Sequence, residues 1–281
     1  MSKIVLPPLQ GVGAGLTCVM PVIPQGETYD MIMLKLGGTT MTKALLENIK
    51  IKLGGKTIME VTGTQLDSIN SYLGHTANAS YLPIWFKEPG ARTITGEEIG
   101  GLDTSVGYTS FSMEIKVGAG ALAPTIDSWA LRSDPKDELN AAGRPNETKK
   151  MFRAFLNSQP PAPGAATYNL DLPLGSRTGT LLKRAHFFHT SLTNLEVKKD
   201  GVGIWESESI ADDQFIQNEL TRVTQAGHFC YDPIFRDNQS DAIPTIRDNG
   251  QTSVFEFKGT FSAADANFTA VTELYTTLDQ I

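Results

Sequence analysis

Two histidines lie close together in the segment His186-Phe-Phe-His189. Imidazole nitrogens are common ligands of zinc and other transition metals. The segment has the apolar character of a strand, however, and side chains three positions apart on a strand point to opposite faces of the sheet. Metal enzymes of the duplicated cupin type need histidines one residue apart, followed by a carboxylate and a third histidine, and this pattern is absent. We therefore expect ordinary strand histidines rather than a metal site.

A cluster of side-chain oxygens occurs at Asp237-Asn-Gln-Ser-Asp241, followed by Asp248-Asn249. Carboxylate and amide oxygens are the ligands that calcium prefers. The spacing is not that of an EF-hand, because the glutamate at the twelfth loop position is missing. Asx-rich turns in contact with solvent are the favoured interpretation.

Adjacent carboxylates at Glu97-Glu98 and Asp212-Asp213 could serve as a general acid and base. Such neighbours are far commoner as surface or helix-capping residues. The sequence contains no His-Glu-x-x-His, no Gly-x-Ser-x-Gly and no phosphate-binding Gly-x-x-x-x-Gly-Lys-Ser/Thr motif. Gly11-Val-Gly-Ala-Gly15 falls short of a dinucleotide fingerprint, and we interpret it as a flexible approach to the first strand, with no strand before it and no helix after it. We expect no catalytic residues and no bound cofactor.

Three tryptophans, Trp85, Trp129 and Trp205, raise the possibility of a sugar-stacking surface. Trp85 and Trp205 fall at alternating positions of predicted strands, so packing in a core or an interface is the favoured interpretation.

The elements that carry these residues are duplicated. Residues 194–207 repeat residues 48–61 without a gap, with five of the fourteen positions identical. Each copy is an alternating apolar run, a two-residue turn (Gly54-Gly55 or Asp200-Gly201) and a second short run, which predicts a tight β-hairpin. Chance likeness of two β-rich segments is the alternative, since strands share alternation and turn residues.

A short helix is predicted after each hairpin. In the first half Leu66, Ile69 and Leu73 recur at helical spacing after Thr64, and in the second Ile216, Leu220 and Val223 follow the capping candidates Asp212 and Asp213. Further matches keep the same order on both sides of the hairpins: Ile23-Pro-Gln-Gly26 with Leu172-Pro-Leu-Gly175, Pro83-Ile-Trp-Phe-Lys87 with Pro233-Ile-Phe-Arg236, and Glu114-Ile-Lys116 with Glu256-Phe-Lys258. The order of elements is therefore repeated as well as their composition.

Fifteen strands are predicted from alternation and turn residues. They cover residues 16–24, 29–36, 47–53, 56–61, 81–86, 108–117 and 125–132 in the first half, and 150–157, 166–172, 179–189, 193–199, 202–206, 229–235, 252–261 and 268–277 in the second. Seven or eight strands per unit fit a jelly roll or another antiparallel sandwich. We predict domains at residues 1–133 and 150–281, joined by a polar linker over 134–149.

Composition agrees with two modest domains, since 281 residues with 40% hydrophobic and 20% charged residues are typical of globular proteins. No apolar run is long enough to span a bilayer, and the first residues lack the apolar core of a secretory signal, so we expect synthesis and folding in a cytoplasm. Cys18 and Cys230 are then expected to be buried free thiols, although a disulfide between the halves is the alternative.

The net charge of −7 and the absence of a Lys/Arg cluster argue against direct binding of nucleic acid. Only Lys3 is basic among the first fifteen residues, so the sequence has no basic N-terminal arm. If the protein acts near a genome, another layer is expected to separate them.

The first part of the chain resembles a known family. Pro24-Gln-Gly-Glu-Thr-Tyr29 before an Ile/Leu-rich strand, the hairpin that starts at Asn48 and the helix around Leu66 resemble the N-terminal part of the corticovirus-type major capsid protein. The resemblance covers residues 6–73, and in the second half it depends on length, duplication and strand order.

This resemblance implies an all-β fold of two tandem jelly-roll sandwiches, a double jelly roll, with short helices in loops. It implies a major capsid protein without catalytic activity, whose homotrimers form pseudo-hexagonal capsomers of an icosahedral bacteriophage virion with an internal membrane. Implied partners are neighbouring capsomers, minor capsid or vertex proteins and the viral membrane or its proteins. Structural calcium at subunit contacts is a further implication, without assigned ligands.

The alternative from another class is a two-domain β-sandwich that binds carbohydrate, or a hydrolase or amidase built on paired jelly rolls. It differs in quaternary structure, because such a protein can work as a monomer. For the capsid hypothesis, the long segments 87–107 and 236–251 are the predicted outward or inter-capsomer loops.

Overall fold

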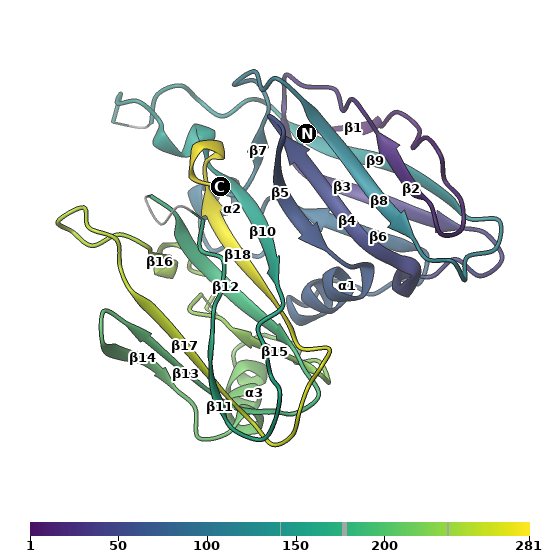
Figure 1. Ribbon diagram of the computed structural model, residues 1–281. Coiled ribbons are helices and arrows are strands. Elements are labelled where there is room, and N and C mark those ends of the chain that lie inside the picture. The colour runs from purple at the N-terminus through teal and green to yellow at the C-terminus, as the bar shows by residue number, and fades with distance from the viewer. Residues whose placement is uncertain (141, 176–178, 235) are drawn as a thin grey trace.

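The computed structural model describes residues 1–140, 142–175, 179–234 and 236–281, and almost all its regular structure is β (Figure 1). The first half contains strands β1 (Ser2–Val5), β2 (Thr17–Met20), β3 (Thr28–Gly37), β4 (Leu46–Leu53), β5 (Lys56–Val61), β6 (Tyr81–Trp85), β7 (Leu102–Asp103), β8 (Phe111–Val117) and β9 (Thr125–Ser133). The second half contains β10 (Phe152–Ser158), β11 (Thr167–Leu170), β12 (Leu181–Phe188), β13 (Leu192–Lys199), β14 (Val202–Glu206), β15 (His228–Tyr231), β16 (Ile243–Pro244), β17 (Phe255–Phe261) and β18 (Thr269–Thr276).

The α-helices are short: α1 (Gly63–Tyr72), α2 (Ile94–Glu98) and α3 (Ile210–Glu219). Single 3-10 turns occur at η1 (Lys43–Leu45), η2 (Glu147–Lys150), η3 (Gln239–Asp241) and η4 (Leu278–Gln280). Among the residues that the structure describes, none of the helices has the length and apolar character needed to cross a membrane.

Each half is an eight-stranded jelly roll with the same topology. The first sandwich pairs its strands in the order β1-β9-β3-β6 on one sheet and β2-β8-β4-β5 on the other, and β7 is added to β3. The second repeats this as β10-β18-β12-β15 and β11-β17-β13-β14, and β16 is added to β12. The predicted double jelly roll with helices in loops is confirmed.

Local irregularities are duplicated with the strands. Register shifts occur at Tyr29/Met31 and Leu182/Arg184, at Leu46/Asn48 and Leu192/Asn194, and at Ile51/Lys52 and Val197/Lys198. Because each pair occupies the same place in its sandwich, residues of the two halves can be matched one to one. The bulge residue Asp30 of β3 corresponds in this way to Lys183 of β12.

All fifteen predicted strands are present, with corrections at their ends. The strand predicted over 229–235 starts at His228 and ends at Tyr231, and Phe235, part of a predicted match between the halves, lies outside the described residues. Sequence reasoning missed β1, β7, β16 and α2. The statement that no strand precedes Gly11 was wrong, since β1 does, and residues 6–16 connect β1 to β2.

The two helices after the hairpins are confirmed, but their caps differ from the prediction. Helix α1 starts after Thr62, whose side chain accepts from the backbone N–H of Gln65 in a capping box, and not after Thr64. Helix α3 is capped by Ser209, and the carboxylates of Asp212 and Asp213 lie in its first turn. There they interact favourably with the positive end of the helix dipole rather than acting as the cap.

The alternating pattern places the core between the sheets of each sandwich. In β4, Leu46, Ile49, Ile51 and Leu53 are fully buried and the residues between them are polar, as expected when one face of a sheet is solvated. The predicted fate of the cysteines is confirmed: Cys18 on β2 and Cys230 on β15 are buried free thiols.

The predicted hairpin turns have the backbone that they require. The φ angles are +55° and +81° at Gly54 and Gly55, and +54° and +80° at Asp200 and Gly201, as in type I′ turns. Glycine occupies this left-handed region without the steric cost that other residues incur.

Replacement of Gly55 or Gly201 by Val is therefore expected to lower the free energy of unfolding by about 1–3 kcal/mol. Gly90→Val is the matched control, because Gly90 has no positive φ and a Cβ there meets nothing within 4 Å. Thermal unfolding measures the effect. Equal melting temperatures for Gly55→Val, Gly201→Val and the control would contradict the requirement for a residue that tolerates positive φ at these two positions.

The two sandwiches are joined edge to edge. Strand β5 of the first pairs in parallel with β10 of the second at Met59 and Phe155, which makes one nine-stranded sheet. Phe152, Phe155 and Val271 of the second half belong to the hydrophobic core of the first. Figure 1 shows β5, β10 and β18 side by side where the halves meet.

The predicted linker, residues 134–149, runs from the end of β9 towards β10 and is anchored through Lys136; its Ala141 lies outside the described residues. The Lys136 ammonium donates to the carbonyl oxygens of Ile99, Thr148 and Met151 at 3.1, 3.0 and 2.9 Å. Burial lowers the pKa of Lys136 to about 7.

Lys136→Met is expected to lower the free energy of unfolding by about 1–3 kcal/mol, because three carbonyls lose their donor while the side-chain volume is kept. Lys150→Met, an exposed change at the end of η2 next to this segment, is the control. Denaturant unfolding at pH 6, where Lys136 is charged, measures both. If both variants unfold like the parent, the anchor does not stabilise the fold.

Candidate functional site: the junction between the two sandwiches

The outer face of sheet β10-β18-β12-β15 is polar where it meets the first sandwich. Strand β12 reads Leu-Leu-Lys-Arg-Ala-His-Phe-Phe, and all of it except its two ends is buried. Leu182, Ala185 and Phe187 face the core of their own sandwich. The bulge at Lys183 turns Lys183 and Arg184 to the same, outer face, where His186 also lies.

Glu273 on β18 lies at the centre of this face. Its carboxylate is 2.6 Å from Nε of Arg153, 2.7 Å from Nζ of Lys183, 3.3 Å from Nη1 of Arg184 and 3.2 Å from Nε2 of His186. The Glu273 and Lys183 side chains are fully buried. Burial alone would raise the pKa of Glu273, but the three cations hold it well below its usual range.

The first sandwich contributes a second carboxylate. Glu88, in the segment after β6, pairs with Lys183 and lies 3.4 Å from Nη1 of Arg184. The surrounding cations hold the pKa of Glu88 below its usual range, against the effect of burial. Burial lowers the pKa of Lys183 to about 8, and Arg153 adds to this while the carboxylates oppose it. Glu88 thus bonds the first half to β12.

A branch of the network stabilises the segment after β15. Asp232 lies 3.1 Å from Nε of Arg184, close enough for an ion pair, and accepts a hydrogen bond from Nε of Arg222 at 2.8 Å. Nη1 of Arg222 reaches Asp237 at 2.7 Å, and its Nη2 donates to the carbonyl of Ile234 at 2.9 Å. Ion pairs among the described residues join Arg153, Lys183, Arg184 and Arg222 to Glu88, Asp232, Asp237 and Glu273 in one network.

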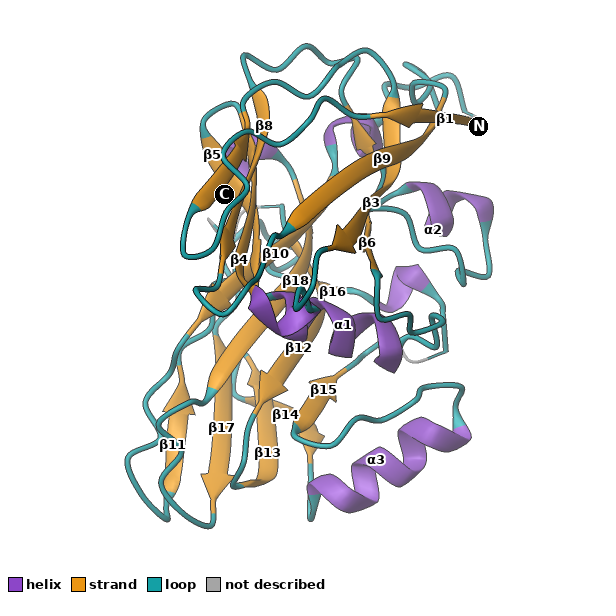
Figure 2. Ribbon diagram, turned by 90° about the vertical axis from the view of Figure 1, so that its right-hand side faces the viewer, coloured by secondary structure: helices purple, strands orange, loops and turns teal. Residues whose placement is uncertain are grey.

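Helix α1 of the first sandwich covers this face, and Figure 2 shows it between the two halves. The Tyr72 hydroxyl donates to Asp232 at 3.3 Å, and the Tyr72 carbonyl accepts from the backbone N–H of Val223 at 3.0 Å. Gln65 donates to the hydroxyl of Thr269 at 3.0 Å. The helix therefore bonds to the second sandwich along its length.

Two histidines complete the junction. His186 Nδ1 and His228 Nε2 are 3.0 Å apart, and His228 Nδ1 lies 2.9 Å from the hydroxyl of Ser68 on α1. Burial lowers the pKa of both imidazoles. The pKa of His228 is held well below its usual value, mainly by burial, with His186 and His189 adding to the effect. Both rings are neutral near pH 7 and act as hydrogen-bonding links.

That His186 and His189 do not bind a metal together stays a prediction. His186 is not an ordinary strand residue, because its ring lies in the buried junction. His189 follows the end of β12, and His186 bonds with His228 and Glu273. Within the described ranges, no three His, Cys, Asp or Glu side chains come together in an arrangement that could hold a metal.

The oxygen-rich loop forms turns, as predicted. Ser240 and Asp241 bond to the side chain of Asn238, and the backbone N–H of Gln251 bonds to Asn249. Asp237 is used by Arg222. Calcium at subunit contacts stays a prediction.

The acidic pairs serve separate roles. Asp213 accepts from the indole of Trp205 at 3.3 Å, and burial raises the pKa of this carboxyl, whereas Asp212 is exposed. Glu97 is half-buried and Glu98 exposed on α2. The predicted helix-end and surface roles describe these residues.

The tryptophans pack against other rings in half-buried positions. Trp85 stacks on His75, Trp129 contacts Tyr81 edge to face, and Trp205 contacts Tyr231 edge to face. The ring centroids of these pairs are 5.3, 5.9 and 5.6 Å apart, respectively. Trp129 and Tyr81 lie on the outer face of sheet β1-β9-β3-β6, since they are cross-strand neighbours of Met33 and Lys35.

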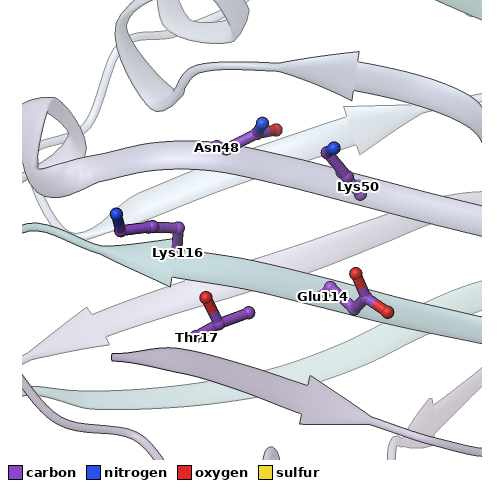
Figure 3. Close-up of a pocket in the computed structure, with 5 residues that line it drawn as sticks. All are labelled: Thr17, Asn48, Lys50, Glu114 and Lys116. Carbon is purple, nitrogen blue, oxygen red and sulfur yellow. The ribbon is translucent and has the colours of Figure 1, made fainter. Parts of the chain in front are cut away.

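A hollow on the outer face of sheet β2-β8-β4-β5 is lined by charged and polar side chains (Figure 3). Thr17, Asn48, Lys50, Glu114 and Lys116 line it. Lys50 pairs with Glu60 at 3.0 Å, Lys52 with Glu114 at 2.6 Å and Lys116 with Glu47 at 3.6 Å. The opposite charges in each of these pairs thus neutralise one another, as on a solvated sheet face.

The two long segments predicted as outward loops contact one another. The backbone N–H of Arg92 donates to the carbonyl of Asp237 at 3.2 Å, and Gly96 of α2 lies against Gln239. The hydroxyl of Tyr275 donates to Gln239 at 2.5 Å, which fixes this contact to β18. Their role between capsomers stays a prediction.

Two jelly rolls in tandem, with one topology and a buried junction between them, define a double jelly-roll protein. Residues 3–134 match the family described as viral coat protein P2 N-terminal domain, and residues 152–278 match viral coat protein P2 C-terminal domain. The chain therefore belongs to the viral coat protein P2 family, and its place is the capsid of a virion. The resemblance found in the sequence is confirmed.

Solved structures agree on the fold. The major capsid protein P2 from Bacteriophage PM2 is similar with a TM-score of 0.83 and 17% identity, over 100% of this chain and 99% of that one. The STIV major capsid protein is similar with a TM-score of 0.66 and 15% identity, over 99% of this chain and 98% of that one. A chain from the structure of Sulfolobus Turreted Icosahedral Virus is similar with a TM-score of 0.62 and 14% identity, over 98% of this chain and 90% of that one. No curated protein matches the sequence.

The junction residues were not singled out by sequence reasoning. Lys183-Arg184, two adjacent cations inside an otherwise apolar strand, and Glu273 inside the strand predicted over 268–277 were the available signals. Each is a charge where a strand buried on both faces would have apolar residues.

Proposed function

We propose that three copies of this chain associate as a closed trimeric capsomer with a pseudo-six-fold outline, and that these capsomers tile the facets of an icosahedral shell. The observation that carries the proposal is the fixed junction between two sandwiches of the same topology. Three chains then supply six similar units, and closed cyclic assembly needs matching surfaces at the two ends of each chain.

The junction suits this role because it orients the sandwiches specifically. A buried ion network is weak evidence for stability but can specify one arrangement, since displacement leaves charges buried without partners. The continuous sheet through β5 and β10 adds backbone bonding to the same contact.

An internal membrane between shell and genome is part of the proposal. The chain carries a net charge of −7 and has Lys3 as the one basic residue among residues 1–15, so it is poorly suited to neutralise phosphates. Expected partners are neighbouring capsomers, minor capsid or vertex proteins and membrane proteins. We infer a purely structural role without catalysis, and the carbohydrate-binding or hydrolase alternative finds no support in the comparisons.

The absolute mass of the purified protein by light scattering after size exclusion tests the proposal. The expected mass is three times the 30.5 kDa of one chain. Repeating the measurement with calcium and with a chelator tests the predicted cation, whose removal is expected to weaken the trimer. A monomer at all protein concentrations, with and without calcium, would contradict the proposal.

A further inference from the structure

The junction inside the chain uses one set of surfaces from each sandwich. The first sandwich contributes the edge strand β5 and helix α1, and the second contributes the edge strand β10 and the outer face of β10-β18-β12-β15. Because the topology is duplicated, each surface has a counterpart in the other sandwich. The counterparts are β14 and α3 of the second sandwich, and β1 and the outer face of β1-β9-β3-β6 of the first.

We propose that these counterparts form the contact between neighbouring copies, with α3 and β14 of one chain seated on β1 and the outer face of β1-β9-β3-β6 of the next. This inference depends on the proposed trimer and assigns its surfaces. The partner is a second copy of this chain because the same chain already forms the equivalent contact internally.

Helix α3 and strand β14, which form one side of the proposed contact, carry exposed apolar side chains. Helices α1 and α3 each start one residue after their caps, Thr62 and Ser209, so Phe215 corresponds to Ser68. Ser68 faces His228 in the junction, whereas the Phe215 side chain is 66% exposed. Val202 and Ile204 on β14 are exposed as well. In Figure 2, α1 lies between the sandwiches and α3 lies at the end of the molecule.

The side that receives α3 and β14 is an outer sheet face with an apolar row. Val5, Trp129, Met33 and Pro83 are direct cross-strand neighbours across β1, β9, β3 and β6. Trp129, Met33 and Pro83 are half-buried and Val5 is 82% exposed. The corresponding row of the second sandwich, Asn157, Val271, His186 and Cys230, lies in the junction, where its last three members are at most 1% exposed.

Matching the bulge residues Asp30 and Lys183 makes Lys35 equivalent to Phe188. The partner of Lys35 on β6 is Tyr81, and the partner of Phe188 on β15 is His228. The internal contact of Ser68 with His228 therefore predicts a contact between Phe215 of one copy and Tyr81 of the next. A polar pair inside the chain is replaced by an aromatic pair between chains, as suits a surface buried on association.

Cross-linking tests this pair directly. The double variant Phe215→Cys, Tyr81→Cys is expected to form disulfides between chains under mild oxidation, because the equivalent side chains inside the chain are in contact. Denaturing gels should then show covalent dimers and trimers. The control is Phe215→Cys with Leu122→Cys, since Leu122 is 57% exposed, and so more accessible than the half-buried Tyr81, but lies in the loop between β8 and β9. The native thiols of Cys18 and Cys230 are buried and should not react.

A second variant tests the energetics. Phe215→Asp is expected to weaken trimer formation at least tenfold, and Leu122→Asp is expected to leave the trimer intact, with both keeping the parent's circular dichroism. If the native protein is a trimer but Phe215→Asp does not weaken it and the Cys pair forms no more cross-links than the control, the assigned surfaces are wrong and the proposed function stands. If the native protein is a monomer, both fail.

Discussion

Replacement of Glu273 by Gln is expected to lower the free energy of unfolding by about 3–5 kcal/mol, because it removes the central anion from a buried network. Arg153, Lys183 and Arg184 lie 2.6 to 3.3 Å from the Glu273 carboxylate. In the variant these cations stay buried with too little negative charge around them. Denaturant unfolding at pH 7 measures the loss.

The matched control is Glu114→Gln. Glu114 pairs with Lys52 at 2.6 Å on the outer face of the first sandwich, where both side chains are 31% exposed. Exposed ion pairs contribute about 0–1 kcal/mol, so this variant should unfold almost like the parent. Similar losses for Glu273→Gln and Glu114→Gln would show that the buried network does not hold the sandwiches together.

Acid is expected to weaken the junction, starting near pH 6.5. His186 and His228 have lowered pKa values in the folded state, so the unfolded chain takes up their protons first as the pH falls. Stability conferred by the neutral rings is therefore present above the unfolded pKa of about 6.5 and is lost below it, by about 1.4 kcal/mol per pH unit for each ring that stays neutral.

Below about pH 4.5 the carboxylates add to this loss. Glu88 and Glu273 have folded pKa values below their usual range, so their contribution is present above the unfolded value and lost as the pH falls towards the folded one. Melting temperatures between pH 7.5 and 4 measure both stages. His228→Gln should flatten the first stage, and an unchanged slope between pH 6.5 and 5 in this variant would rule out His228 as its cause.

The duplicated hairpins could be predicted because their signals are local. A type I′ turn needs two residues with positive φ, and Gly54-Gly55 and Asp200-Gly201 satisfy this within two positions. Alternation in the flanking strands gives the buried face directly, as in β4. Strands β7 and β16 could not be predicted in this way, because two residues are too few to show an alternation of apolar and polar side chains. These strands exist only through pairing with β3 and β12.

The buried charged junction depends on tertiary structure. Lys183 faces Glu88, 95 residues away, only because a bulge turns it to the outer face of β12. No local pattern encodes that pairing. Charged residues are almost never fully buried unless paired, so a sequence reading places them at the surface by default. Two adjacent cations in an apolar strand are the feature that could have indicated a buried partner.

The residues that cap α1 and α3 could also not be predicted from the sequence alone. Several Ser, Thr and Asp residues precede each helix, and composition alone does not say which one adopts the extended backbone of a cap. Thr62 and Ser209 do so at the ends of equivalent hairpin strands, which sequence spacing left uncertain by two or three residues.

Electron microscopy of the purified native protein, averaged without imposed symmetry, shows directly whether three chains form one capsomer. We expect particles of three chains with a hexagonal outline and six similar densities, alternating between the two sandwiches of each chain. Two-lobed single chains at assembly concentrations, or closed rings with another number of chains, would contradict it.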